Sequence, residues 1–126
     1  MQIPVGYPIC FTAHGNPVPK QSFRAKNNGH GYTPARVRAW ENIVAWAARE
    51  AVAGMQPLTE AVRVECDFYV ADKRKKDCTN LWKAVEDACT TAGVWKDDDQ
   101  VVDMHVRKHL VGRGEGRVVI QIDIKE

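Results

Sequence analysis

A lone carboxylate and a run of three in this chain could hold a divalent cation. Asp77 stands directly after a run of cations, and aspartates follow one another at 97–99. Successive carboxylates repel one another, so a bound cation or a basic partner would stabilise them. Mg²⁺ prefers hard oxygen ligands, takes one or two carboxylates and completes its shell with water and phosphate oxygens. The sequence therefore favours metal-assisted chemistry at a phosphate, with Asp77, Asp97 and Asp98 as candidate ligands.

Further polar side chains lie on a helix predicted beside these carboxylates. Asn80, Lys83 and Asp87 are spaced i, i+3 and i+7, so they share one helix face. An ordinary helix also explains this pattern, with Asp77 or Thr79 as its N-cap. A pair between Lys83 and Asp87 would then contribute only about 0.3 kcal/mol. The spacing alone leaves both interpretations open.

Cations gather in three segments, although the formal net charge of +2 is too small to indicate a nucleic-acid-binding protein. They are Lys73, Arg74, Lys75 and Lys76 before Asp77, Lys20, Arg24 and Lys26 in a loop rich in glycine and proline, and Arg107 with Lys108. Such clusters make the local electrostatic field strong, and the run at 73–76 could hold a phosphate group beside a metal ion. A solvated loop is the other explanation of the run at 73–76.

The periodicity of the apolar residues predicts an α+β fold in the order β-α-β-α-β-β. Helical spacing indicates one helix from Thr33-Pro34 to Gly54 and another over 79–92. Strands are expected at 3–12, 62–70, 101–110 and 118–124, and the last two should form a hairpin around the glycine-rich link. The length of 126 residues and the hydrophobic content of 44% fit one domain over residues 1–126, with two helices packed on a mixed sheet.

The predicted second helix separates the two groups of carboxylates. If the segment from Asp77 to Asp97 were one straight helix, it would be more than ~20 Å long. The two ends could then share one ion only if the chain doubled back after Ala92, or if a partner subunit supplied one of the groups.

Composition excludes several other classes of protein. The four cysteines are widely spaced and form no CxxC pair, so neither a zinc site nor a disulfide framework is expected. No apolar run approaches the ~20 residues that cross a membrane, and the N-terminus lacks the pattern of a signal peptide. The sequence predicts a soluble cytoplasmic protein with reduced thiols and no membrane partner.

Several spaced motifs occur in a specific order along almost the whole chain. They are DCTNLWKA at 77–84, EDA at 86–88, AGVWKDDDQV at 92–101, GNPVPK at 15–20 and YTP at 32–34. Together they closely resemble the RusA-type Holliday junction resolvases, Mg²⁺-dependent endonucleases found in bacteria and especially in prophages.

The resemblance implies roles for individual residues. Asp77 and Asp98 match metal-binding catalytic carboxylates, with Asp97 beside them. Lys83 matches the catalytic lysine, and Asn80 matches the family's asparagine. The resemblance further implies Mg²⁺ as the cofactor, with Mn²⁺ able to replace it, and a homodimer that nicks two opposed strands of a four-way DNA junction. With such a substrate, the cations at 73–76 and then Lys20, Arg24 and Lys26 become the candidate DNA-binding residues, which would hold phosphates and position a duplex without reading its sequence.

Thr79 is the position at which the chain departs from the family pattern. The best-known members carry a second catalytic aspartate there. A neutral hydroxyl can still coordinate Mg²⁺ or hold a metal-bound water. We expect the remaining carboxylates, supported by Asp87, to suffice; a weakened or inactive site is the alternative.

Two further hypotheses compete with a junction resolvase. A chain that had lost a metal ligand at Thr79 could bind branched DNA without cutting it. A nuclease of the same chemistry could instead prefer flaps or replication forks. Cleavage of a synthetic junction with and without Mg²⁺ separates binding from catalysis.

Overall fold

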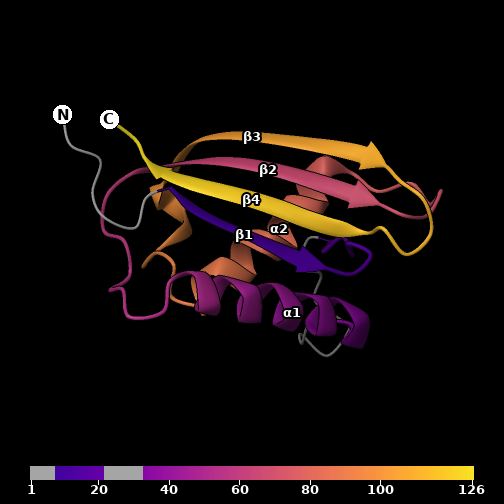
Figure 1. The fold of residues 1–126 in the computed structure, drawn as a ribbon, viewed down its shortest axis with the longest axis horizontal. Coiled ribbons are helices and arrows are strands. Elements are labelled where there is room, and N and C mark those ends of the chain that lie inside the picture. Colours follow the sequence, from indigo (N-terminus) through magenta and orange to yellow (C-terminus); the bar gives the residue numbers. More distant parts are fainter. Residues whose placement is uncertain (1–7, 22–32) are drawn as a thin grey trace, which may run out of the picture.

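A computed structural model describes residues 8–21 and 33–126 of the chain (Figure 1). Its elements are β1 (Ile9–His14), α1 (Ala35–Ala51), β2 (Val62–Val70), α2 (Cys78–Thr91), the 3₁₀ helix η1 (Asp98–Gln100), β3 (Val101–Leu110) and β4 (Arg117–Ile124). The predicted order of helices and strands is therefore confirmed. The bounds of β2 and β3 are as predicted, while residues 3–7 of the predicted first strand lie outside the described residues.

Four strands form one mixed sheet in the spatial order β1-β4-β2-β3. β4 runs antiparallel to both β1 and β2, and β3 runs parallel to β2. Both helices cover one face of this sheet (Figure 1). α2 is the crossover connection that parallel neighbours such as β2 and β3 require.

The predicted hairpin of the last two strands is wrong, because β4 lies on the far side of β2 from β3. The link at 111–116 is long enough to step over one strand, since neighbouring strands lie about 4.8 Å apart. At its end Gly15 donates a backbone hydrogen bond to Gly116 (3.0 Å). Gly116 must stay small there, because a Cβ would lie 2.8 Å from the Cα of Asn16. In its central place β4 buries Val118, Ile120 and Ile122 completely, whereas β3 at the edge leaves Met104 and Leu110 exposed.

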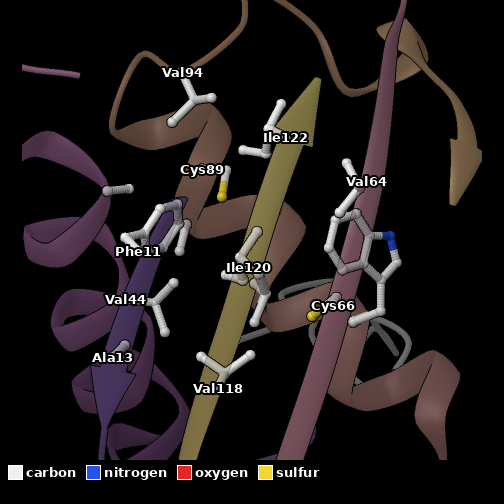
Figure 2. Close-up of a cluster of buried hydrophobic side chains, with 14 of the residues drawn as sticks. Phe11, Ala13, Val44, Val64, Cys66, Cys89, Val94, Val118, Ile120 and Ile122 are labelled. Carbon is white, nitrogen blue, oxygen red and sulfur yellow. The ribbon is translucent and has the colours of Figure 1, made fainter. Parts of the chain in front are cut away.

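The core lies between the sheet and the two helices. Alternate residues of β2 and β4 point into it, and Val64, Cys66, Ile120 and Ile122 are fully buried (Figure 2). The helix residues in the same core cluster are Trp40, Val44, Ala45 and Ala48 of α1, and Leu81, Trp82, Ala84, Val85, Ala88 and Cys89 of α2. Burial of one face of each helix fixes which face α2 leaves for polar side chains.

No helix in the described part of the chain is long and apolar enough to span a bilayer.

Candidate active site

Three carboxylates meet where the C-terminal half of α2 faces η1. Glu86, Asp87 and Asp98 each offer one oxygen, and these oxygens lie within 4.8 Å of one another. We call this group the acidic cluster. Glu86 and Asp87 are half-buried on α2, and Asp98 is exposed. Repulsion within such a group is relieved by a proton or a cation.

A reversal of the chain after α2 creates the acidic cluster. Gly93 ends the helix with a left-handed φ of +80°, a conformation that glycine adopts without strain. Val94 then donates to the carbonyl of Cys89 (3.1 Å), and Trp95 is buried in the core. The chain thus doubles back, but it brings the aspartate triplet to Glu86 and Asp87 and not to Asp77, the carboxylate for which the reversal was considered.

Gln100 holds the aspartate triplet in place. Its side-chain oxygen accepts from the backbone N–H groups of Lys96 and Asp97, both at 2.9 Å. Its side-chain nitrogen donates to the carbonyls of Leu58 and Glu60 at 2.8 and 2.9 Å. Sequence reasoning had given this glutamine no role, although it belongs to the quoted motif at 92–101.

The neighbouring aspartates of the triplet have different surroundings. Asp97 is the N-cap of η1, and its carboxylate accepts from the backbone N–H of Asp99 (3.0 Å). Asp98 is thereby left to face α2. Of the two aspartates predicted as ligands in the triplet, the structure brings Asp98 into the acidic cluster and gives Asp97 a capping contact.

Glu86 was not among the predicted site residues, although it stands next to Asp87 in the quoted motif. Desolvation raises the pKa of Glu86, and the nearby carboxylates of Asp98 and Asp87 raise it further. The indole N–H of Trp82 donates to Glu86 (2.9 Å), which favours the charged form. The pKa of Glu86 is therefore raised overall, first by burial of its carboxyl group and then by the two neighbouring carboxylates.

A cation from the N-terminal loop borders the acidic cluster. The ammonium of Lys20 lies 2.8 Å from Asp87 and 3.1 Å from Glu41 of α1. Burial opposes the charge of Lys20, but hydrogen bonds to these two carboxylates raise its pKa overall. Lys20 thus pairs with acids here, and its predicted contact with DNA stays a prediction. Arg24 and Lys26 lie outside the described residues.

A cleft of about 400 Å³ opens between α1 and α2 beside this pair. Polar side chains of both signs line it, and they include Lys20, Arg38, Glu41, Asp87 and Asp98. Such a cleft offers carboxylate oxygens to a metal ion and cations to a phosphate group within one space.

Asp77 lies at the other end of α2, away from the acidic cluster. It is the exposed N-cap residue, and its side chain makes no capping hydrogen bond. It precedes Asp87 by ten positions, which corresponds to about 15 Å of helix rise. Lys83 is half-buried between the two ends, and Thr79 is exposed near Asp77. Within one subunit the structure does not bring Asp77 and Asp98 together.

The basic run divides into exposed and buried residues. Lys73, Arg74 and Lys75 are exposed, whereas Lys76 is only 7% exposed. The ammonium of Lys76 donates to the carbonyl of Pro17 (2.8 Å) and pairs with Asp72 (3.2 Å). Lys76 therefore ties the loop after β1 to the loop after β2, and its predicted phosphate contact stays a prediction.

We expect Lys76→Met to lower the stability of the protein and Lys75→Met to weaken its binding to DNA. Lys76→Met leaves the buried Pro17 carbonyl without its donor, so the free energy of unfolding should fall by about 1–3 kcal/mol. Lys75→Met should change it by less than about 0.5 kcal/mol, because the side chain is exposed. Urea unfolding measures both changes.

The same two variants test which lysine contacts phosphates. Loss of a phosphate contact reduces the slope of log K against log salt by about 1. We expect this reduction for Lys75→Met alone in binding titrations of branched DNA. A reduced slope for Lys76→Met at unchanged stability would contradict the structural role of Lys76.

Comparison with known proteins identifies the family. The family model for the endodeoxyribonuclease RusA matches residues 14–123. Proteins named crossover junction endodeoxyribonuclease RusA from Escherichia coli K12 and Enterobacteria phage 82 are 36% and 35% identical to this chain over 96 residues, 76% of this chain and 78% of theirs. The protein of that name from Aquifex aeolicus is 31% identical over 107 residues, 84% of this chain and 83% of its own. The chain, with its acidic cluster and basic run, belongs to the RusA family of endodeoxyribonucleases.

Proposed function

We propose that this protein is a Mg²⁺-dependent, structure-selective endonuclease that resolves four-way DNA junctions by paired nicks. The relatives named above are crossover junction endodeoxyribonucleases, which supports a DNA junction as the substrate. The observation that carries the chemistry is the acidic cluster beside a cleft that also holds Lys20 and Arg38. DNA as substrate makes the cytoplasm the expected place of action.

The donors of the acidic cluster fit a hard divalent cation. Carboxylate oxygens are the ligands that Mg²⁺ and Mn²⁺ prefer, and histidine and cysteine, which would favour zinc, are absent from the acidic cluster. Asp98 and Asp87 would hold the ion, with Glu86 beside them. When bound, the ion supplies an activated water and neutralises charge on the phosphate.

The protein's own side chains would position the DNA and stabilise developing charge. The exposed Lys73, Arg74 and Lys75 would hold phosphates that flank the scissile bond. Lys83 would donate to a nonbridging oxygen, where negative charge grows in the transition state. Arg38 in the cleft is placed to hold a further phosphate.

The distance between Asp77 and Asp98 supports a homodimer in this proposal. Both match catalytic carboxylates of the family, yet α2 separates them within one subunit. A partner subunit could supply the missing carboxylate at each site. Two such sites suit a junction, because symmetric nicks require a symmetric enzyme.

Cleavage of a synthetic four-way junction tests the function. We expect nicks in two opposed strands in Mg²⁺ and none in EDTA, and much slower cleavage of a linear duplex of the same sequence. Tight junction binding without nicking at any concentration of Mg²⁺ or Mn²⁺ would favour the noncatalytic branched-DNA-binding protein. Faster cleavage of flap or fork substrates would favour the flap/fork nuclease.

Thr79→Asp should strengthen metal binding. The position is exposed near the N-terminus of α2, where an added carboxylate is favoured by the helix dipole. A further negative oxygen ligand should lower the Mg²⁺ concentration for half-maximal cleavage by roughly tenfold, since affinity follows the charge of the ligands. A titration of cleavage rate with Mg²⁺ measures this change. Thr79→Asn, which adds a neutral oxygen, is the matched control and should shift the midpoint far less.

A further inference from the structure

The edge strand β3 carries an exposed row of apolar side chains. Val102, Met104 and Leu110 are 58%, 51% and 70% exposed. In the register with β2, Met104 lies beside Val64 and Leu110 lies beside Val70, and both valines are buried in the core. The row therefore points to the face that carries the helices, and it is exposed because no described residue covers the outer side of β3.

The backbone of β3 also offers an open hydrogen-bonding edge. β3 is ten residues long and pairs with β2 on one side, while the described residues provide no strand on the other side. Figure 1 shows β3 at the margin of the sheet, away from α1. A long apolar edge of this kind pairs with another strand unless it is blocked. The opposite edge, β1, has only six residues, and its inward side chains are buried.

We propose that β3 pairs antiparallel with β3 of a second copy of this chain, with Val106 on the two-fold axis. This inference rests on the proposed function only in that it names the interface of the proposed homodimer. The two four-stranded sheets then join into one continuous sheet. Each contact across the axis occurs twice, as the symmetry of a closed dimer requires.

The sequence of β3 complements itself in this register. Val102 of one copy lies opposite Leu110 of the other, so the two most exposed apolar side chains of the strand cover each other at both ends. On the outer face, Asp103 lies opposite His109, so a carboxylate meets an imidazole. Such directly opposed pairs are the contacts that stabilise antiparallel strands.

Neighbouring registers fit less well. An axis at His105 sets two imidazoles against each other and leaves Leu110 opposite the polar Gln100. An axis at Arg107 sets two guanidinium groups against each other, which is destabilising, whereas the axis at Val106 sets Arg107 opposite the imidazole of His105 and Lys108 opposite Met104.

The same two-fold axis would also bring Asp77 of one copy towards Asp98 of the other. Asp98 lies just before the start of β3. Asp77 lies beside the other end, because the ammonium of Lys108 donates to the backbone carbonyl of Lys76 at 2.7 Å. Antiparallel pairing reverses one strand, so the Asp98 end of one copy lies at the Asp77 end of the other. Ile43 and Trp46 on α1 are also exposed and apolar, but they lack this connection to Asp77 and Asp98 through a shared strand.

Molecular mass in solution tests the interface. We expect the wild type to sediment as a dimer and Leu110→Glu to sediment as a monomer at the same micromolar concentration, with an unchanged far-UV circular dichroism spectrum. Trp46→Glu is the matched control, because that side chain is 65% exposed on α1, and it should remain dimeric. A dimeric Leu110→Glu, or a monomeric Trp46→Glu, would overturn the assignment of the interface to β3.

Cross-linking tests the register. In a Cys10→Ser background, Val106→Cys should form a covalent dimer under mild oxidation, because the two Cβ atoms on the axis lie about 5 Å apart in paired antiparallel strands. Val102→Cys alone should not form a covalent dimer, because the residue opposite it is Leu110. The double variant Val102→Cys with Leu110→Cys should form one. Failure of Val106→Cys to cross-link in a dimeric protein would overturn the proposed register.

These measurements are independent of nuclease activity. A protein that cleaves junctions in Mg²⁺ but stays monomeric, or dimerises through α1, would refute the interface and leave the function. A β3-linked dimer that never cleaves DNA would refute the function and leave the interface.

Discussion

Asp98→Asn should abolish junction cleavage while the protein still folds and binds junction DNA. The change removes one negative charge from the acidic cluster, in which the oxygens of Glu86, Asp87 and Asp98 lie within 4.8 Å. Loss of one group that acts directly at a reacting centre costs about 10²–10³ in rate, and we expect a fall of at least about 100-fold. Single-turnover cleavage of a four-way junction measures it.

Thermal unfolding provides a second measurement that does not depend on activity. A ligand that binds only the folded state stabilises it. Mg²⁺ should therefore raise the melting temperature of the wild type and raise that of Asp98→Asn much less. In EDTA, Asp98→Asn should be at least as stable as the wild type, because one source of repulsion with Glu86 is gone.

Asp99→Asn is the matched control for this experiment. Asp99 lies next to Asp98 in η1 and is exposed, but it does not belong to the acidic cluster. The same change of charge there should leave cleavage within about threefold, because screening by water and salt weakens the effect of exposed charges. Equal loss of activity in both variants would show that only the overall charge of the triplet matters.

Asp77→Asn should have the second large effect, and it should be a loss of cleavage without a loss of stability. Asp77 is an exposed N-cap whose side chain makes no capping hydrogen bond. Asparagine is an equally good N-cap, so the free energy of unfolding should change by less than about 0.5 kcal/mol. A helix that does not use this carboxylate leaves it available as a ligand, and we expect cleavage to fall by at least about 100-fold.

Asp123→Asn provides the comparison for Asp77→Asn. Asp123 lies in β4 beside Arg63 of β2, on the face of the sheet away from the helices, and it accepts from the side chain of Gln121 (3.0 Å). Neither cleavage nor junction affinity should change there. If Asp77→Asn kept full activity, the assignment of a catalytic role to Asp77 would fail, and the acidic cluster alone would carry the reaction.

A mixture of Asp77→Asn and Asp98→Asn tests whether each active site takes residues from both copies of the chain. If each site takes Asp77 from one copy and Asp98 from the other, a mixed dimer of Asp77→Asn and Asp98→Asn regains one intact site. Mixtures should then nick one strand of the junction, whereas each variant alone should nick neither. No recovery in mixtures shown to exchange subunits would place both aspartates in the same subunit's site.

Local pattern was sufficient to predict the secondary structure. Alternating apolar residues located β2 and β3 at their observed bounds, and helical spacing located α2 to within one residue. Periodicity succeeds because it reports which face of an element is buried, and the burial pattern of β2 follows the alternation of its sequence. The motifs at 77–84 and 92–101 also indicated Asp77, Asp98 and Lys83 through their resemblance to the family, and the roles of these residues stay predictions.

The local sequence pattern could not predict the order of the strands in the sheet. The glycine-rich link between β3 and β4 has the composition of a hairpin, yet β4 crosses β2 to lie between β1 and β2. The observed order rests on long-range contacts: Val118, Ile120 and Ile122 are fully buried where β4 lies between β1 and β2. A turn signal contains no information about which distant strand offers the larger buried surface.

The sequence by itself determined the kinds of element, the face that each buries and the residue types available for chemistry. Only the tertiary structure decided which of these residues meet: Glu86 and Asp87 with Asp98, Lys20 with Asp87, and Lys76 with Pro17. The physical reason is that spacing along the chain fixes neighbours only within one helix or strand. Contacts between elements depend on chain reversals and on the competition among all apolar surfaces for burial.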